Sequence, residues 1–151
     1  MEFFKDGDEA QRLLYRTTGS WKRIQNQLQE IAEYWPGLCE RLPGIHTKVT
    51  PATTARWRMN GETLGKKFTV TATPLSYGAG DQQKLFAQLV LAVAHPVEEE
   101  MAIVSSVLMD SAGAFYTLPE RVVLGNEGDE ASYHLLFSII NQVLAADAAA
   151  I

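Results

Sequence analysis

The sequence has a single cysteine, Cys39, among its 151 residues. An intrachain disulfide is therefore excluded, and a reducing compartment is predicted. Residues 1–6 mix charged and apolar side chains where a secretion signal needs an apolar run. The longest apolar stretch, Leu85–Ala94, is interrupted by Gln88 and falls short of the ~20 residues that cross a bilayer. We therefore expect a soluble, cytoplasmic protein with no membrane partner.

Motifs for metal, phosphate or nucleophilic chemistry are also missing. The three histidines lie in separate segments, with no His-x-x-x-His or Cys-x-x-Cys spacing. The glycines within residues 77–81 lack the third glycine and the Lys-Ser/Thr pair of a phosphate loop. Cys39 and His46 form the one nearby thiol–imidazole combination, and no orienting group accompanies them. The sequence predicts no catalytic residue, no metal and no cofactor, so we expect Cys39→Ser to leave activity intact.

The composition is that of a globular protein. Apolar residues make up 46% and charged residues 21% of the chain. A chain of this length buries enough surface to fold without a disulfide or a metal. No long linker or internal repeat divides the sequence, so a single domain over residues 1–151 is predicted.

Charge is distributed unevenly along this acidic chain, whose net charge is −5. Residues 1–67 hold 11 basic and 8 acidic side chains, whereas residues 68–151 hold 2 basic and 10 acidic ones. Such asymmetry is found in polarised binding surfaces, although folding can also interleave the two halves and blur it.

The first half opens with a helical pattern. Apolar side chains follow one another at intervals of 3, 4, 3 and 4 residues from Trp21 to Trp35, with polar residues between them. The pattern predicts an amphipathic helix that covers a core. Gly19 leaves open whether this is one kinked helix or two, and Pro36-Gly37 is expected to end it.

Alternating patterns typical of strands follow at residues 45–50, 54–59 and 68–72. Asn60-Gly61 is the preferred dipeptide of a type I′ hairpin, so a turn is predicted there. Trp57, Met59, Phe68 and Val70 are expected on the buried face of this hairpin.

The second half reads as strands and then a helix. Residues 82–94 fit either a helix or a strand, and the flanking turn residues favour a strand. Residues 101–109, 114–118 and 122–124 predict further strands, and a final helix begins near Asp129. The expected fold is α+β, an antiparallel sheet of about five strands with an N-terminal and a C-terminal helix packed on it.

Four basic residues form the candidate interaction site: Arg56, Arg58, Lys66 and Lys67. If Trp57 and Met59 enter the core, strand alternation sends both arginines to solvent. There they can meet an acidic partner, or the acidic half of a second copy in a homodimer. A simple solvated sheet face explains the same pattern.

We therefore predict a non-enzymatic protein-binding module, such as a chaperone, an immunity-type inhibitor or an assembly adaptor. If residues 82–94 were helical, the element order would resemble that of class I secretion chaperones, which are small, acidic and dimeric. One alternative is a small enzyme or ligand-binding domain with a pocket between helices and sheet, using His95, Tyr77 or Asp110. Another is a nucleic-acid-associated protein that uses the basic hairpin, which the acidic pI of about 5.2 opposes.

Overall fold

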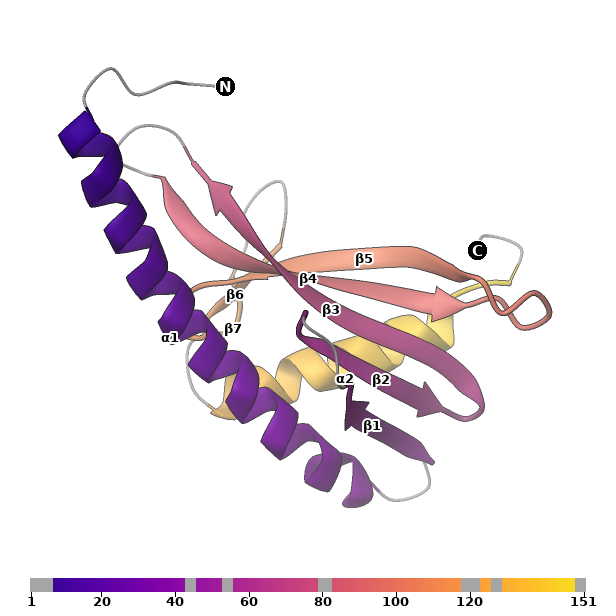
Figure 1. Ribbon diagram of the computed structural model, residues 1–151. Helices are drawn as coiled ribbons and strands as arrows, with labels where there is room; N and C mark the ends of the chain where they lie inside the picture. Colours follow the sequence, from indigo (N-terminus) through magenta and orange to yellow (C-terminus); the bar gives the residue numbers. More distant parts are fainter. Residues whose placement is uncertain are drawn as a thin grey trace.

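The computed structural model describes residues 7–42, 46–52, 56–78, 83–117, 123–125 and 129–148. A long helix, seven strands and a second helix follow one another along the chain (Figure 1). Each strand pairs antiparallel with the next, so the sheet is a simple meander. The predicted α+β class is confirmed, and two short strands extend the expected sheet of about five. The elements are α1 (Gly7–Glu40), β1 (Thr47–Pro51), β2 (Arg58–Thr63), β3 (Lys66–Tyr77), β4 (Lys84–Ala94), β5 (Met101–Met109), β6 (Phe115–Tyr116), β7 (Val123–Gly125) and α2 (Asp129–Ala145).

Both helices share one hydrophobic core with one face of the sheet. Trp35 of α1 and Leu136 of α2 are fully buried, and the Trp35 indole Nε1 donates a hydrogen bond to the Ser132 hydroxyl at 2.8 Å. Neither helix, over its described residues, is long and apolar enough to cross a membrane. The buried residues that the sheet contributes include Val49, Met59, Phe68, Val70, Ala72, Leu89, Leu91 and Val93.

Helix α1 is continuous, and the expectation that it ends at Pro36-Gly37 is wrong. Proline removes one backbone N–H from the helix. The next turn nevertheless stays helical, and it buries Leu38 and Cys39 in the core. The apolar contacts of these two side chains outweigh the local penalty. At its other end the helix extends past the sheet, and Leu14 and Tyr15 are exposed there (Figure 1).

The hairpin between β2 and β3 turns at Leu64-Gly65, not at Asn60-Gly61 as predicted. Leu64 and Gly65 both have positive φ, as a type I′ turn requires. Gly61 lies within β2 opposite Phe68, whose ring occupies the place of a side chain at residue 61. The turn lies four residues further along the chain than predicted. Because side chains alternate between the two faces of a strand, a shift by an even number of residues leaves them on the faces that were predicted.

The predicted faces of this hairpin are therefore correct. Met59, Phe68 and Val70 are buried, and Trp57 is partly buried against the same core. The indole Nε1 of Trp57 donates a hydrogen bond to the Leu28 carbonyl of α1 at 3.1 Å. This bond joins the chain just before β2 to the middle of the helix.

Residues 84–94 form strand β4, as the flanking turns favoured. The helical reading is excluded, so the condition for a chaperone-like element order is not met. Strand β3 also continues through Pro74, which pairs with Ala87. The Ala72 N–H donates a hydrogen bond to the Trp57 carbonyl, on the side of β3 that faces β2. Pro74, two residues later, lacks an N–H on that same side, but β2 does not reach it, because the pairing of β2 with β3 begins at Arg58 opposite Thr71.

Candidate functional site

The four basic residues of the predicted interaction site do not form one patch. Lys66 lies opposite the buried Thr63, and alternation places Lys67 on the other face of the sheet, opposite Glu62. Arg58, at the start of β2, is half-buried, and its Nε is enclosed without a hydrogen-bond partner in the described structure. Arg56 is exposed in the segment before β2.

Lys66 has a structural role on the face of the sheet that packs against α2. Its ammonium donates hydrogen bonds to the carbonyls of Val143, Leu144 and Ala146, at 3.1, 3.2 and 2.8 Å. These carbonyls lie at the C-terminal end of α2, where the helix leaves acceptors unpaired and its dipole favours a cation. The Lys66 ammonium thereby fixes the end of α2 to the β2–β3 hairpin.

Arg56 borders an open groove of about 720 Å³ between α1 and β3. The indoles of Trp21 and Trp57 line it, together with Gln25 and Gln29 of the helix. This groove presents apolar and amide groups beside one guanidinium, a combination suited to contact with a polypeptide.

The outer face of α2 lacks charged side chains over the described positions from residue 131 onward. Residues 131–146 contain no aspartate, glutamate, lysine or arginine. The side that faces solvent nevertheless exposes Phe137 by 40% and Leu144 by 37%. The other exposed side chains of this stretch are His134, Ser138, Asn141 and Ala145. A solvent-facing helix surface this long and uncharged is unusual, because charged residues normally occupy the polar side of an amphipathic helix.

Helix α1 provides the internal comparison. Its exposed positions include Arg12, Lys22, Arg23, Glu30 and Glu33. The two helices contribute to the same core, yet only α1 has an ordinary charged back. The uncharged back of α2 is therefore a property of that helix and not of the fold.

Strand β5 adds an apolar sheet edge beside α2. Only Leu108 and Met109 of β5 pair with β6, so on that side residues 101–107 have no strand partner among the described residues. This segment has no charged residue, and it exposes Met101, Ile103 and Val104 by 41, 74 and 39%. Ile103 pairs with Ala92 and points to the sheet face away from the helices. Natural sheet edges are usually protected by charge, proline or a covering segment.

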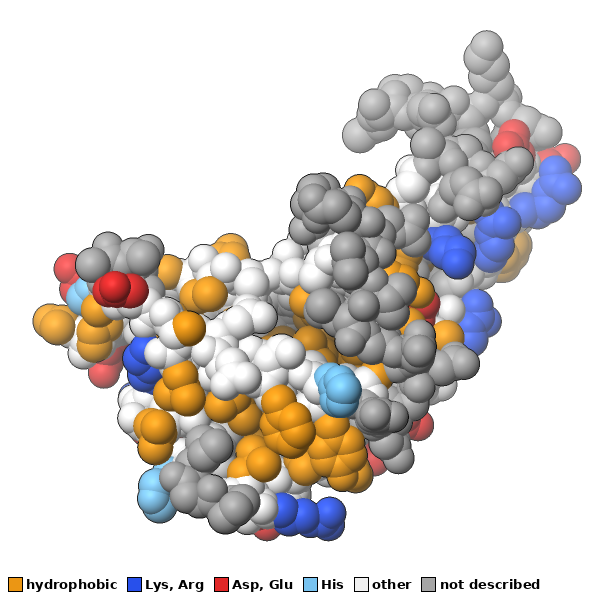
Figure 2. All heavy atoms as spheres, turned by 180° about the vertical axis from the view of Figure 1, so that it is seen from behind, with side chains coloured by type: hydrophobic (Ala, Val, Ile, Leu, Met, Phe, Trp, Pro, Cys, Tyr) orange, Lys and Arg blue, Asp and Glu red, His pale blue; other side chains and the backbone are white. Residues whose placement is uncertain are grey.

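The two features adjoin each other where the Ser105 hydroxyl of β5 donates a hydrogen bond to the Gln142 side-chain oxygen of α2. We call the outer face of α2 (residues 133–145) together with the free edge of β5 (residues 101–107) the α2–β5 surface. Helix α2 lies behind the strands in Figure 1, so Figure 2 shows its outer face. Hydrophobic and uncharged side chains occupy the middle of that view, and charged side chains lie at its margins (Figure 2).

An aromatic cluster extends this surface toward α1. The Tyr34 and Tyr133 hydroxyls are hydrogen-bonded to each other, and their rings meet edge to face with centroids 5.5 Å apart. The Tyr133 ring also contacts that of Phe137, at 6.2 Å between centroids. Tyr34 is 37% exposed, so aromatic rings line the junction of the two helices at the surface.

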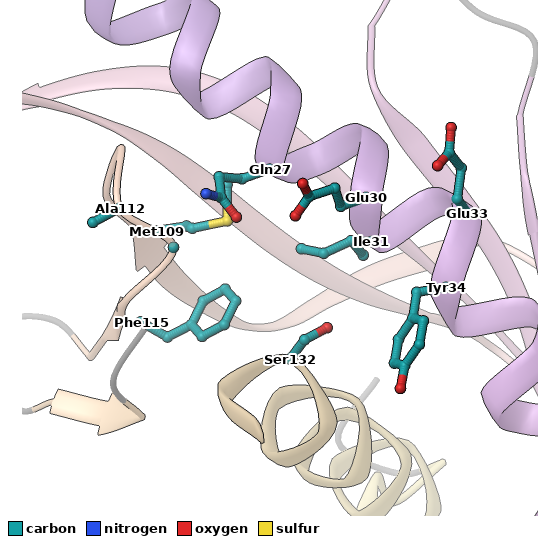
Figure 3. A pocket seen from close by; sticks show the side chains of 10 residues that line it. Gln27, Glu30, Ile31, Glu33, Tyr34, Met109, Ala112, Phe115 and Ser132 are labelled. Atoms are coloured by element: carbon teal, nitrogen blue, oxygen red, sulfur yellow. The ribbon is translucent and has the colours of Figure 1, made fainter. Parts of the chain in front are cut away.

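A cleft of about 590 Å³ opens between α1, the β5–β6 turn and the start of α2. Figure 3 shows the Gln27 and Glu30 side chains directed into it, over an apolar floor that includes Met109 and Phe115. The Glu33 carboxylate points away from that floor (Figure 3) and accepts a hydrogen bond from Gln29 at 3.1 Å. The cleft can hold a group with an apolar stem and a cationic end.

The polar residues expected to serve a pocket do not converge. Asp110 stabilises the β5–β6 turn, where its carboxylate accepts the N–H groups of Ala112 and Ala114 and the Tyr116 hydroxyl. His95 Nδ1 accepts two backbone N–H groups in the β4–β5 turn. Tyr77 lies at the end of β3, in a different part of the sheet from His95.

Cys39 is buried at the end of α1, and burial raises the pKa of its thiol to about 11. The reactive thiolate is therefore scarce near neutral pH. Among the residues that the structure describes, no group of three or more His, Cys, Asp or Glu side chains could hold a metal ion.

The signal that sequence reasoning missed is the lack of charge in residues 131–146. The apolar positions of that helix identify its buried face, but the missing charges concern the opposite face. Leu144, expected on the packed side, is instead exposed. Compared with known proteins, the chain matches no family model, no curated protein and no solved structure.

Proposed function

We propose that this protein is a non-enzymatic protein-binding module, of the chaperone, immunity-inhibitor or assembly-adaptor kind, and that it binds through the α2–β5 surface. The single observation that carries this proposal is the uncharged outer face of α2, which holds two exposed large apolar side chains, Phe137 and Leu144. The centre of a protein interface is depleted in charge and enriched in aromatic residues, and this face has both properties.

Energetics favour a covered state for this surface. Burial of apolar area stabilises a complex by roughly 25 cal/mol per Å². Phe137 and Leu144 offer such area without any charge that must lose its water. Among the described residues, residues 101–107 of β5 have no strand partner on that side, so an extended partner segment can pair with this edge.

The titratable groups support a binding role over catalysis. The one thiol is buried with a raised pKa, and Asp110 and His95 are engaged in separate turns. Catalysis of nucleophilic type needs a nucleophile, a base and an orienting group within hydrogen-bond reach of one another.

The test is site-specific photocrosslinking in the source cell. Benzoylphenylalanine replaces Phe137 in one variant and Tyr15, an even more exposed aromatic residue at the far end of α1, in the other. We expect discrete covalent protein adducts from position 137 and none from position 15. Equal or absent adducts at the two positions contradict the proposal.

The cleft between α1 and α2 supports a second candidate function, the binding of a cationic small molecule. Its volume lies within the ~300–1,000 Å³ of ligand pockets. We expect agmatine, probed by isothermal titration calorimetry, to bind the wild-type chain and to bind Glu30→Gln at least threefold more weakly. Glu33→Gln is the matched control: Glu33 also borders the cleft, but its carboxylate points away from the floor (Figure 3). Absence of measurable heat with the wild-type chain removes this candidate.

A further inference from the structure

We propose that the partner seated on the α2–β5 surface is a second copy of this chain, with the two α2 helices packed antiparallel across a twofold axis. This inference rests on the proposed function, because it names the occupant of the same surface. It is carried by the order of side chains along α2, by the charge of the whole chain and by the area that the surface offers.

The first step is the seam along α2. Four of its exposed residues, His134, Ser138, Asn141 and Ala145, follow one another at intervals of 4, 3 and 4 residues. This spacing places the four side chains in one line along the helix surface. Phe137 lies on one flank of the line, where its exposed ring can enter the neighbour.

The second step is that the seam is self-complementary. A twofold axis at its midpoint, between Ser138 and Asn141, places Ser138 of each copy opposite Asn141 of the other. A hydroxyl and an amide each both donate and accept hydrogen bonds, so the pair is satisfied in either copy. The same axis places His134 opposite Ala145, where the small side chain leaves room for the ring.

The third step concerns charge. The chain carries −5 overall, so two copies repel one another over most of their surfaces. A partner of opposite charge is expected to meet acidic side chains, which residues 131–146 and 101–107 do not offer. An uncharged surface on a charged protein is where two like copies approach without like-charge contacts.

The fourth step is the area that the proposed dimer interface buries on each copy. Helix α2 has 17 residues and is about 25 Å long. A strip about 10 Å wide along it covers roughly 250 Å² per copy, below the ~800 Å² of a standard interface. An area this small indicates a weak, reversible dimer.

Sedimentation equilibrium of the full chain from about 1 to 500 μM tests the inference. We expect the wild-type chain to shift from 16.7 kDa to twice that mass with rising concentration. Asn141→Lys and Asn141→Glu each place like charges across the axis and are expected to weaken dimerisation at least tenfold. An equimolar mixture of the two variants is expected to restore dimers. Asn26→Lys, the same change at an exposed site on α1, is the matched control and is expected to dimerise as the wild type does.

Circular dichroism checks that each variant remains folded. A wild-type chain that stays monomeric throughout, or a mixture that shows no restored dimer, overturns the second-copy inference. The photocrosslinking result keeps the two proposals apart. Adducts from position 137 to a different protein, with a monomeric wild type, overturn the dimer and leave the binding function standing. Absence of both adducts and dimers overturns both.

Discussion

Residue 61 must be glycine because the ring of Phe68 leaves no room for a Cβ atom there, and not because the chain turns at this position. A Cβ built at Gly61 lies 2.2 Å from Cζ of Phe68, whose side chain is buried. We expect Gly61→Ala to lower the free energy of unfolding by about 1–3 kcal/mol, as overpacking of a filled core does. Gly37→Ala is the control, since a Cβ there has open space and alanine favours the helix. Urea unfolding measures both, and equal stability of the two variants contradicts the assignment.

Lys66 and Lys67 are neighbours in sequence with different tasks. Lys66 binds three carbonyls at the end of α2, whereas Lys67 is exposed on the opposite face of the sheet. We expect Lys66→Met to destabilise the fold by about 1–2 kcal/mol, because the last carbonyls of α2 lose their donor. Lys67→Met should stay within about 0.5 kcal/mol of the wild type, as surface changes usually do. Thermal unfolding distinguishes them, and a larger loss for Lys67→Met would refute the placement.

Cys39 gives a pH dependence whose sign follows from its raised pKa. The thiol ionises near its ordinary value of 9 in the unfolded chain but at about 11 in the folded one. Its contribution to stability is therefore complete below pH 9 and is lost as the pH rises from 9 to 11, by at most roughly 2–3 kcal/mol. Urea titrations at pH 8 and 10.5 should show a smaller loss of stability in Cys39→Ala than in the wild type. An identical loss in both argues against a buried thiol.

At the scale of elements, two glycine dipeptides compete for the β2–β3 hairpin. Asn60-Gly61 has the better turn residues, yet the chain turns at Leu64-Gly65. The observed register opposes Gly61 to Phe68 and lets β2 end with Thr63, whose hydroxyl is hydrogen-bonded to that of Thr47 on β1. The partners in these contacts, Phe68 and Thr47, lie outside the four residues of either turn, so local propensity alone selects the wrong one.

Leu64 consequently occupies an unfavourable conformation. Its φ of 49° is left-handed, which costs a non-glycine residue about 1–2 kcal/mol, and its side chain is 57% exposed. We expect Leu64→Asn to raise the free energy of unfolding by about 0.5–1 kcal/mol, because asparagine tolerates this region. Asn60→Leu, within β2, serves as the converse control and should bring no such gain. A destabilised Leu64→Asn variant would show that the turn lies elsewhere.

For the molecule as a whole, charge should govern how fast partners meet and the uncharged surface how long they stay. Arg56 and Arg58 belong to the half of the chain with an excess of basic residues. We expect Arg56→Glu combined with Arg58→Glu to slow association at low salt and to have less effect at high salt, since the charge of the exposed Arg56 is screened. Light scattering at both salt concentrations is the measurement. Unchanged association in every condition removes the two arginines from the functional account.

Local pattern was sufficient for the elements themselves. The spacing from Trp21 to Trp35 predicts α1, and the alternation of Phe68, Val70 and Ala72 predicts β3, because helical and strand periods are written directly in the order of residues. The same holds for β5, whose bounds agree with the predicted residues 101–109. The α+β class follows from these elements alone.

The tertiary structure alone decided the rest. The contact of Lys66 with the end of α2, the continuation of α1 through Pro36 and the position of the β2–β3 turn were not predictable from local sequence. Each of them depends on contacts between residues far apart in sequence. The lack of charged residues in residues 131–146 identifies a candidate interface only once the structure shows that the opposite face of α2 is buried. Sequence states which side chains are apolar or uncharged, but only packing determines which of them remain exposed to solvent.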